Sequence, residues 1–295
     1  MLETRQLTKR FGSLTAVAGL DLSVPEGSVF GVLGPNGSGK TTTLGMVLGV
    51  IHPTSGHFRW FGRKAADESR KRIGAILETP MFYPYLSGEE NLRVAAAIKE
   101  APEASIEPVL KRVGLYERRR DAFRKYSLGM KQRLAIGSAL LGDPEVLVLD
   151  EPTNGLDPQG IADVRQLIVD IGKEGRTIIL ASHLLDEVQK VCTDFAVLRN
   201  GKLLHSGSVE ESLGDEESVE VAAADLAALA AAVRAMDAVT EVEEKRDCLL
   251  VRFEGQIDVA RFHGDLIGQG IVLTRLIPRR KDLEKQFLEI LEQSP

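Results

Sequence analysis

A glycine-rich stretch near the start of the chain constrains its fold more than any other feature. The stretch reads Gly34-Pro35-Asn36-Gly37-Ser38-Gly39-Lys40-Thr41 and fits the pattern G-x-x-x-x-G-K-[ST]. Residues 29–33 before it form an apolar run with the composition of a buried parallel strand, and residues 41–48 after it suit a helix. Because a strand, a glycine-rich turn and a helix follow one another, the pattern predicts a phosphate-binding site in an α/β fold.

The residue types in this loop explain the predicted chemistry. Glycines let the backbone curl, so that successive N–H groups point into one anion-binding concavity at a helix N-terminus. Lys40 would supply a positive charge for the β- and γ-phosphates of ATP, and the Thr41 hydroxyl would reach Mg²⁺. The alternative is a glycine-rich turn that binds nothing, but the flanking strand and helix favour nucleotide binding. We therefore expect residues 34–42, Thr42 included, to contact ATP.

Composition and length limit the other function classes. At 295 residues, the chain exceeds the usual size of one domain, so two domains are expected. The formal net charge of −6 argues against a general nucleic-acid binder. Cys192 and Cys248 lack C-x-x-C spacing, which indicates neither a zinc site nor a disulfide framework, and they suit a reducing compartment.

The sequence predicts no membrane-spanning segment. The most apolar region, residues 221–239, is interrupted by Asp225, Arg234 and Asp237, and therefore falls short of the roughly 18 consecutive apolar residues typical of a spanning helix. The charged start, residues 1–5, does not resemble a secretory leader. Any membrane role is therefore expected to depend on a partner protein.

Two further strand ends carry residues that suit phosphate chemistry. The apolar run at residues 146–149 ends in Asp150-Glu151, where Asp150 could hold Mg²⁺ and Glu151 could polarise an attacking water. Two acids that merely cap a turn are the alternative. His183 follows the apolar run at residues 177–182; a lone histidine is usually structural, but the end of a parallel strand faces the ligand crevice.

Aromatic and basic residues outside the loop leave two interpretations each. Phe11 could stack on adenine or be an ordinary core residue. Residues 81–85 place Phe82, Tyr83 and Tyr85 on a proline-bounded loop, which could be a partner surface or could fold over its own core. The basic run at residues 118–125 is more typical of a solvated face than of an anion-binding surface.

Taken together, these motifs resemble the nucleotide-binding subunit of ATP-binding-cassette (ABC) transporters over residues 1 to about 210. The phosphate loop alone indicates only an NTPase. A signature-like turn with Ser127 and Gly129, then Asp150-Glu151, Leu156-Asp157 and His183, makes an ordered and specific set. The resemblance implies a P-loop NTPase fold of the ABC type, with a mixed core sheet, an antiparallel β subdomain and an α-helical subdomain.

The resemblance also implies a role for each matching residue. Phe11 would stack on adenine, Asp150 would bind Mg²⁺, and Glu151 would be the catalytic base. His183 would contact the γ-phosphate, and Asp157 would couple two ATP sites. Lys40, Glu151 and His183 are then the expected catalytic residues.

The signature residues are expected to contact the ATP of a partner copy. They are Ser127, Leu128, Gly129 and Met130. The family's commonest signature is Leu-Ser-Gly-Gly-Gln, so Leu128 stands where a glycine is usual. Glu78 likewise stands where the family usually has glutamine; its carboxylate could still reach Mg²⁺, at the cost of negative charge near the triphosphate. These departures resemble those of bacitracin and lantibiotic exporters.

The resemblance further implies how the chain would work. Two copies would sandwich two ATP molecules head to tail as a homodimer, bound to an integral-membrane permease at the cytoplasmic face of the membrane. ATP and Mg²⁺ would be the cofactors, and export of a drug or peptide antibiotic the output. The rival is a soluble ATPase of this type that acts on ribosomes or nucleic acid. Such proteins usually carry two cassettes and basic surfaces, whereas this chain has one phosphate loop and a negative net charge.

The C-terminal part has a different character. Acidic residues at 210–217 mark a boundary, and residues 219–277 then read as strand, helix, two strands, helix and strand. This βαββαβ order predicts a small ferredoxin-like α+β domain over residues 215–295, with a final helix at 282–291. It carries no recognisable chemical motif, so a structural or dimer-stabilising role and a ligand-sensing role both stay open.

Overall fold

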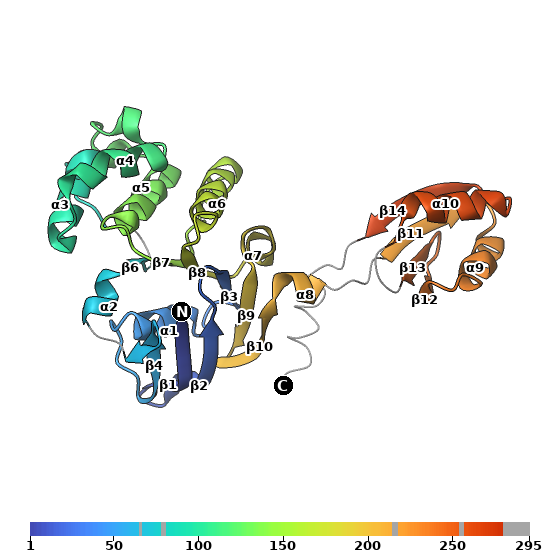
Figure 1. Cartoon of the computed structure of the whole chain (residues 1–295), viewed down its shortest axis with the longest axis horizontal. Helices are drawn as coiled ribbons and strands as arrows, with labels where there is room; N and C mark the ends of the chain where they lie inside the picture. The colour runs from blue at the N-terminus through green and yellow to red at the C-terminus, as the bar shows by residue number, and fades with distance from the viewer. Residues whose placement is uncertain (65–66, 78–80, 214–217, 254–256, 280–295) are drawn as a thin grey trace. The chain divides into compact units, whose positions relative to one another are not determined.

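The computed structural model describes residues 1–64, 67–77, 81–213, 218–253 and 257–279 of the chain (Figure 1). The chain divides into two compact units, Met1–Ser208 and a second unit that begins at Val209. Each unit has its own hydrophobic core. The first unit contains every residue singled out for phosphate chemistry.

A six-stranded sheet is the centre of the first unit. In spatial order its strands are β10 (Lys202–Ser208), β9 (Asp194–Arg199), β3 (Val29–Leu33), β8 (Thr177–Ser182), β7 (Val146–Asp150) and β6 (Ile73–Ile76). The five strands from β9 to β6 are parallel, and β10 pairs antiparallel at the edge. Every residue of β3, β7 and β8 is buried, which explains their uninterrupted apolar runs. The carboxyl ends of these three strands meet at one edge of the sheet.

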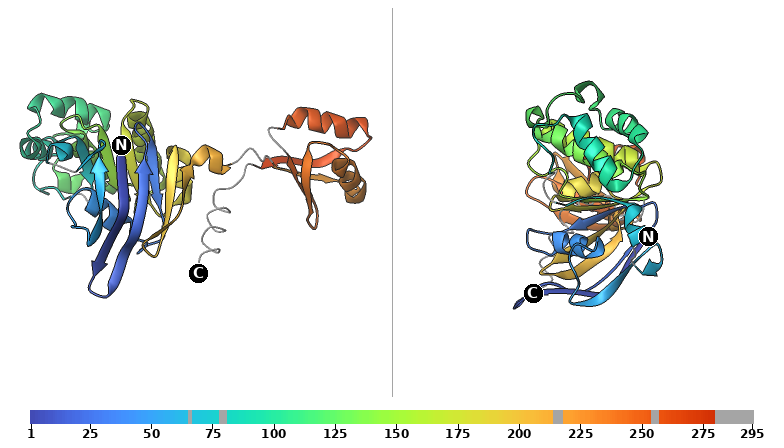
Figure 2. Two further views of the ribbon diagram at one scale, coloured as in Figure 1. Left: turned by 60° about the horizontal axis from the view of Figure 1, so that its bottom comes forward. Right: turned by 90° about the vertical axis from the view of Figure 1, so that its left-hand side faces the viewer.

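A second, antiparallel sheet packs against the first. Its order is β2 (Leu14–Val24), β1 (Leu2–Phe11), β4 (Ser55–Trp60) and β5 (Arg63–Lys64), and the long β1–β2 pair is visible in Figure 2. Helix α1 (Lys40–Val47) lies between the sheets, where the buried Trp60 indole donates a hydrogen bond to the Val47 carbonyl over 2.7 Å. One continuous core therefore holds the phosphate loop and both sheets together.

Helices form the rest of this unit. Figure 1 shows three of them grouped together, α3 (Gly88–Lys99), α4 (Ile106–Arg112) and α5 (Leu128–Leu140). The short α2 (Asp67–Lys71) precedes β6, while α6 (Pro158–Gly172) and α7 (Leu185–Val191) follow β7 and β8. Three 3₁₀ turns join the helical group: η1 (Glu103–Ser105), η2 (Tyr116–Arg118) and η3 (Phe123–Lys125). Helix α5 meets β6 so closely that a Cβ on Gly74 would lie 2.2 Å from the Ala139 carbonyl oxygen.

The second unit has the predicted βαββαβ order. After α8 (Val209–Leu213) come β11 (Ser218–Ala223), α9 (Leu226–Arg234), β12 (Val239–Glu244), β13 (Leu249–Phe253), α10 (Val259–Gly268) and β14 (Leu273–Arg279). The strands form one antiparallel sheet in the order β12-β13-β11-β14, the ferredoxin-like arrangement. Phe253 and Phe262 join the sheet to α10 through an edge-on ring contact at 5.2 Å. The predicted helix at residues 282–291 lies outside the described residues.

The structure confirms the predicted fold class. The mixed core sheet, the antiparallel sheet, the helical group and the α+β unit are all present. The sequence analysis assigned no element to α7, whose seven residues are too few to show a helical period. In the part of the chain that the structure describes, no helix combines the length and apolar composition needed to cross a bilayer.

A helix cap offers a test of this architecture. The Ser87 side chain accepts a hydrogen bond from the Glu90 N–H over 3.2 Å, and the Glu90 carboxylate accepts one from the Ser87 N–H over 2.7 Å. Ser87→Ala should therefore lower the free energy of unfolding by about 1 kcal/mol in urea titration. Ser105→Ala is the control: the Ser105 hydroxyl donates to the exposed turn carbonyl of Pro102 over 2.6 Å but accepts no bond from α4, so its loss should cost less than that of the Ser87 cap. Equal destabilisation by both variants would contradict the assigned role of the cap.

Candidate nucleotide-binding site

The phosphate loop joins β3 to α1 in a conformation that requires glycine. Gly37 and Gly39 have φ angles of 81° and 101°, in the left-handed region that side chains disfavour. A Cβ on Gly39 would also lie 2.6 Å from the Ala16 carbonyl oxygen. The Thr43 N–H donates to the Gly39 carbonyl over 2.8 Å and starts the ladder of α1. The loop is therefore curled over a helix N-terminus, as its pattern predicts.

Lys40 lies inside this loop. Its side chain is 6% exposed, and its ammonium donates to the Gly34 carbonyl over 2.7 Å and to the Pro35 carbonyl over 3.3 Å. The same ammonium lies 3.3 Å from the Glu151 carboxylate. Burying a charged group costs free energy unless it is paired, and these carbonyls and the carboxylate pair with the Lys40 ammonium. The ammonium also places a positive charge inside the phosphate loop.

The end of β7 lies beside the first turn of α1. The Thr41 hydroxyl donates to the Asp150 carboxylate over 2.7 Å, although the two residues are 109 positions apart in the sequence. Hydroxyl and carboxylate oxygens are the ligands that Mg²⁺ prefers, commonly together with substrate phosphates. In the described part of the chain, no group of three or more His, Cys, Asp or Glu side chains is placed to hold a metal. The oxygen donors of Thr41 and Asp150 fit the ligand preference of Mg²⁺.

Glu151 connects the loop to the end of β8. One carboxylate oxygen faces Lys40, and the other lies 2.7 Å from Nδ1 of His183. Its backbone has a φ of 48°, which is rare for a non-glycine residue and is common at functional sites. A hydrogen bond of 3.0 Å from its N–H to the Ala181 carbonyl holds this conformation. The predicted base, the predicted histidine and the loop lysine thus form one polar chain.

Lys40, Thr41 and Glu151 border a cavity of about 460 Å³, while Asp150 and His183 contact these lining residues without lining it themselves. Its lining residues come from the loop, the β1–β2 turn and two strand ends: Phe11, Leu14, Thr15, Ala16, Asn36, Gly37, Gly39, Lys40, Thr41, Thr42, Glu151 and Asn200. Phe11 is 50% exposed at the cavity and is therefore not a core residue; the Lys9 ammonium lies 4.9 Å from its ring. Its stacking on adenine stays a prediction.

Four of the lining residues carry no signal in the sequence that links them to a nucleotide. The β1–β2 turn folds back beside Phe11 and thereby brings Leu14, Thr15 and Ala16 to the cavity. The β9–β10 turn brings Asn200 there. The dipeptide Asn200-Gly201 is typical of a β-hairpin turn, but nothing in the sequence places this turn at the nucleotide cavity. Glu78, the predicted third metal contact, lies outside the described residues.

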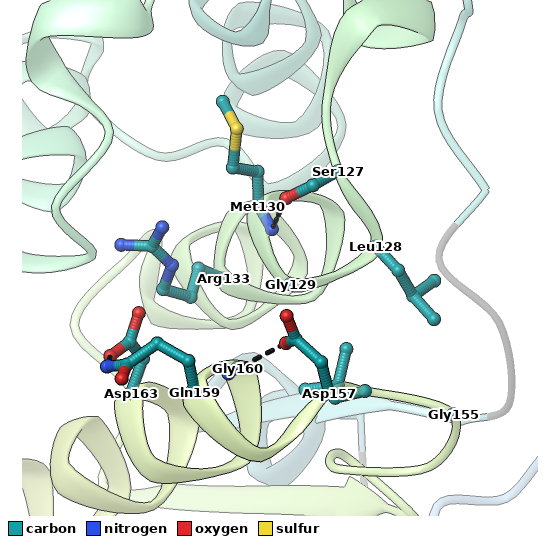
Figure 3. Close-up of a pocket in the computed structure, with 11 residues that line it drawn as sticks. Ser127, Leu128, Gly129, Met130, Arg133, Gly155, Asp157, Gln159, Gly160 and Asp163 are labelled. Carbon is teal, nitrogen blue, oxygen red and sulfur yellow. Dashed lines mark hydrogen bonds between the residues drawn. The ribbon is translucent and has the colours of Figure 1, made fainter.

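The signature residues lie elsewhere, in a second hollow of about 380 Å³ (Figure 3). Ser127 caps α5 by accepting a hydrogen bond from the Met130 N–H over 3.2 Å. Leu128 and Gly129 line the hollow together with Asp157, which caps α6 by accepting from the Gly160 N–H over 2.9 Å. Among the residues described, the two hollows share no lining residue. One copy of the chain therefore does not bring its signature to its own phosphate loop.

Comparison with known proteins identifies the family. The family model described as "ABC transporter" matches residues 17–154. The chain is 33% identical over 297 residues to "Bacitracin transport ATP-binding protein BcrA" of Enterococcus faecalis, which covers 99% of this chain and 96% of that protein. The chain belongs to the ABC transporter family. As an ABC ATP-binding subunit it is an ATPase that acts on ATP.

Further relatives agree with this assignment. "Lantibiotic transport ATP-binding protein SrtF" of Streptococcus pyogenes is 36% identical over 220 residues, 75% of this chain and 94% of that protein. The solved structure of cbiO1 from Clostridium perfringens, described as part of an ABC transporter complex, is 30% identical, with a TM-score of 0.65 over 71% of this chain and 89% of that one. A dimeric cassette, MJ0796 bound to ADP and Pi, shares the fold at 23% identity, with a TM-score of 0.64 over 71% of this chain and 99% of that one. The resemblance predicted from the motifs is confirmed.

The position of Lys40 leads to a direct test of the site. Among the described residues that line the cavity, Lys40 is the only lysine, so Lys40→Ala should lower ATP affinity by about thirtyfold or more, or about 2 kcal/mol. Equilibrium binding of a fluorescent ATP analogue measures the change. Lys173→Ala is the matched control, because Lys173 is exposed, pairs with Asp170 and does not line the cavity. Unchanged affinity in Lys40→Ala would refute the assigned role.

Proposed function

We propose that this ABC ATPase works as a head-to-tail homodimer that drives export of a peptide antibiotic or similar drug through a separate membrane subunit. The observation that carries the proposal is that Lys40, Thr41 and Glu151 line one cavity, with Asp150 bonded to Thr41 and His183 to Glu151 directly behind them. The export direction is supported by the bacitracin and lantibiotic transport proteins to which the chain is similar. Their names favour transport over the soluble ribosomal alternative.

Each residue of the cavity has a proposed part in hydrolysis. Thr41 and Asp150 would hold Mg²⁺, which would neutralise charge on the phosphate oxygens. Lys40 would donate hydrogen bonds to the β- and γ-phosphates. Glu151 would accept a hydrogen bond from the attacking water, and His183 would orient the Glu151 carboxylate and contact the γ-phosphate.

The separation of the two hollows supports the head-to-tail dimer. Ser127 and Gly129 lie on the helical part, in a hollow distinct from the one that holds the phosphate loop. In a head-to-tail pair, the Ser127 hydroxyl and the N–H groups at the start of α5 would face the nucleotide of the partner copy. Asp157 lies beside them and would join the two sites. Residues 1–210 would form this ATP-binding domain, and residues 215–295 an accessory domain.

An exposed loop is our candidate for contact with the membrane subunit. Met81 is 93% exposed and Tyr85 is 70% exposed, and such apolar groups commonly mark an interface. Phe82 lies on the same loop, but its ring packs against that of Phe123, with 5.1 Å between the ring centroids, and so anchors the loop to the helical part. Docking through this loop would hold the ATPase at the cytoplasmic face of the membrane, without any nucleic-acid partner.

Trapping the dimer tests the first part of the proposal. Glu151→Gln keeps the shape of the side chain but removes the proposed base, so hydrolysis should fall by about 10²-fold or more while ATP still binds. The variant should then elute as a dimer in size-exclusion chromatography with ATP and Mg²⁺, and as a monomer without ATP. Glu145→Gln serves as the control, since Glu145 is exposed and pairs with Arg72 outside the cavity. A Glu151→Gln protein that stays monomeric with ATP would remove the basis for the sandwich.

Charge substitutions test the membrane contact. The double variant Met81→Glu/Tyr85→Glu should lose co-purification with the membrane subunit, because it would place two carboxylates in an apolar interface. Its ATP affinity should stay within about twofold of the parent, since neither residue lines the cavity. Ile98→Glu, on another exposed apolar residue of the helical part, should assemble normally. Normal assembly of the double variant would exclude this loop as the contact.

A further inference from the structure

Helix α7 begins two residues after His183 and carries a nearly buried acid. Glu187 is 5% exposed, and its carboxylate accepts a hydrogen bond from the Arg165 guanidinium of α6 over 2.6 Å. The side chain of Arg165 is 25% exposed. An acid that is this buried costs free energy unless it is paired, so the contact between α6 and α7 depends on both partners.

Another face of α7 packs on the strand that leads to the phosphate loop. A Cβ on Gly31 of β3 would lie 2.7 Å from Val188 and 3.1 Å from the sulfur of Cys192. The absence of a side chain at Gly31 therefore lets α7 approach β3 closely. Helix α7 therefore packs on β3 and pairs with Arg165 of α6.

The link from α7 to His183 is short and hydrogen-bonded. The Leu184 N–H donates to the Ser182 hydroxyl over 3.0 Å, and Leu184 is followed directly by the first residue of α7. His183 lies between Ser182 and Leu184 in the sequence, and its Nδ1 is 2.7 Å from the Glu151 carboxylate. A displacement of α7 would therefore move the imidazole relative to the Glu151 carboxylate.

We propose that Arg165 and Glu187 are positioning residues for hydrolysis, which place His183, and through it Glu151, against the phosphate loop. The inference rests on the proposed roles of His183 and Glu151. Neither Arg165 nor Glu187 lines the nucleotide cavity, so both act through α7 rather than on the substrate. Because Arg165 belongs to the helix that Asp157 caps, the pair also connects the signature hollow to the histidine.

The test uses the full chain and compares catalysis with binding. Glu187→Gln should lower kcat for ATP about tenfold, because small displacements of catalytic groups are costly, while KM stays within about threefold. ATP-binding stoichiometry should remain that of the parent. The charge-reversed double variant Arg165→Glu/Glu187→Arg should recover a large part of kcat. Lys190→Gln, which removes an exposed pair on the same helix, should leave kcat unchanged.

A double-mutant cycle separates positioning from simple destabilisation. If Glu187 acts through His183, Glu187→Gln should lower kcat less than about twofold in a His183→Ala background. A full tenfold effect in that background, or an unchanged kcat in Glu187→Gln alone, would overturn the inference. If Glu187→Gln does not fold, Arg165→Lys replaces it, since lysine keeps the charge but lacks the planar guanidinium group. The kcat of Arg165→Lys should fall while its ATP-binding stoichiometry stays that of the parent. A kcat equal to that of the parent would refute the proposal.

ATP hydrolysis by the parent chain distinguishes failure of the proposed catalytic roles from failure of the positioning role of Arg165 and Glu187. A parent that binds ATP but shows no hydrolysis above the Lys40→Ala background would contradict the proposed catalytic roles themselves. A parent that hydrolyses ATP, alongside a Glu187→Gln protein that equals it, would contradict only the positioning role of the pair.

Discussion

The site depends on how one buried ammonium group is held. Lys40 is almost inaccessible to solvent, and carbonyls of its own loop and the Glu151 carboxylate surround it. These contacts join the loop after β3 to the end of β7, and the bond from Glu151 to His183 extends the join to the end of β8. A nucleotide that offers phosphate oxygens to Lys40 would compete with Glu151 for the same cation. The position of Glu151 is thereby linked to what the loop binds.

The parallel sheet makes this arrangement possible. Strands β3, β8 and β7 are neighbours and run in the same direction, so the segments that follow them emerge at one edge. Their complete burial keeps the strand ends in register, and the closely packed residues Gly31 and Gly74 let helices lie directly on the sheet. The buried apolar strands and the helices packed on them therefore fix the positions of the polar residues at this edge of the sheet.

The helical part carries the signature residues, which do not reach the nucleotide cavity of their own copy. The signature turn opens into a hollow shared with the start of α6, and this hollow is separate from the nucleotide cavity. Helix α6 leads from that hollow to Arg165, and Arg165 leads to α7 and His183. The proposed dimer thus involves the start of α6, and the proposed positioning pair involves the middle of the same helix.

The sequence by itself determined the parts whose signals are local. The loop pattern, the apolar runs of β3 and β8 and the acids after β7 follow from spacing and composition, and so do the ABC resemblance and the βαββαβ order. Only the tertiary structure decided which distant residues meet. It placed Asn200 and Ala16 at the nucleotide cavity, turned Phe82 onto Phe123 while Tyr85 stayed exposed, and buried Glu187 against Arg165. Such contacts depend on the packing of helices on a sheet, which no short stretch of residues encodes.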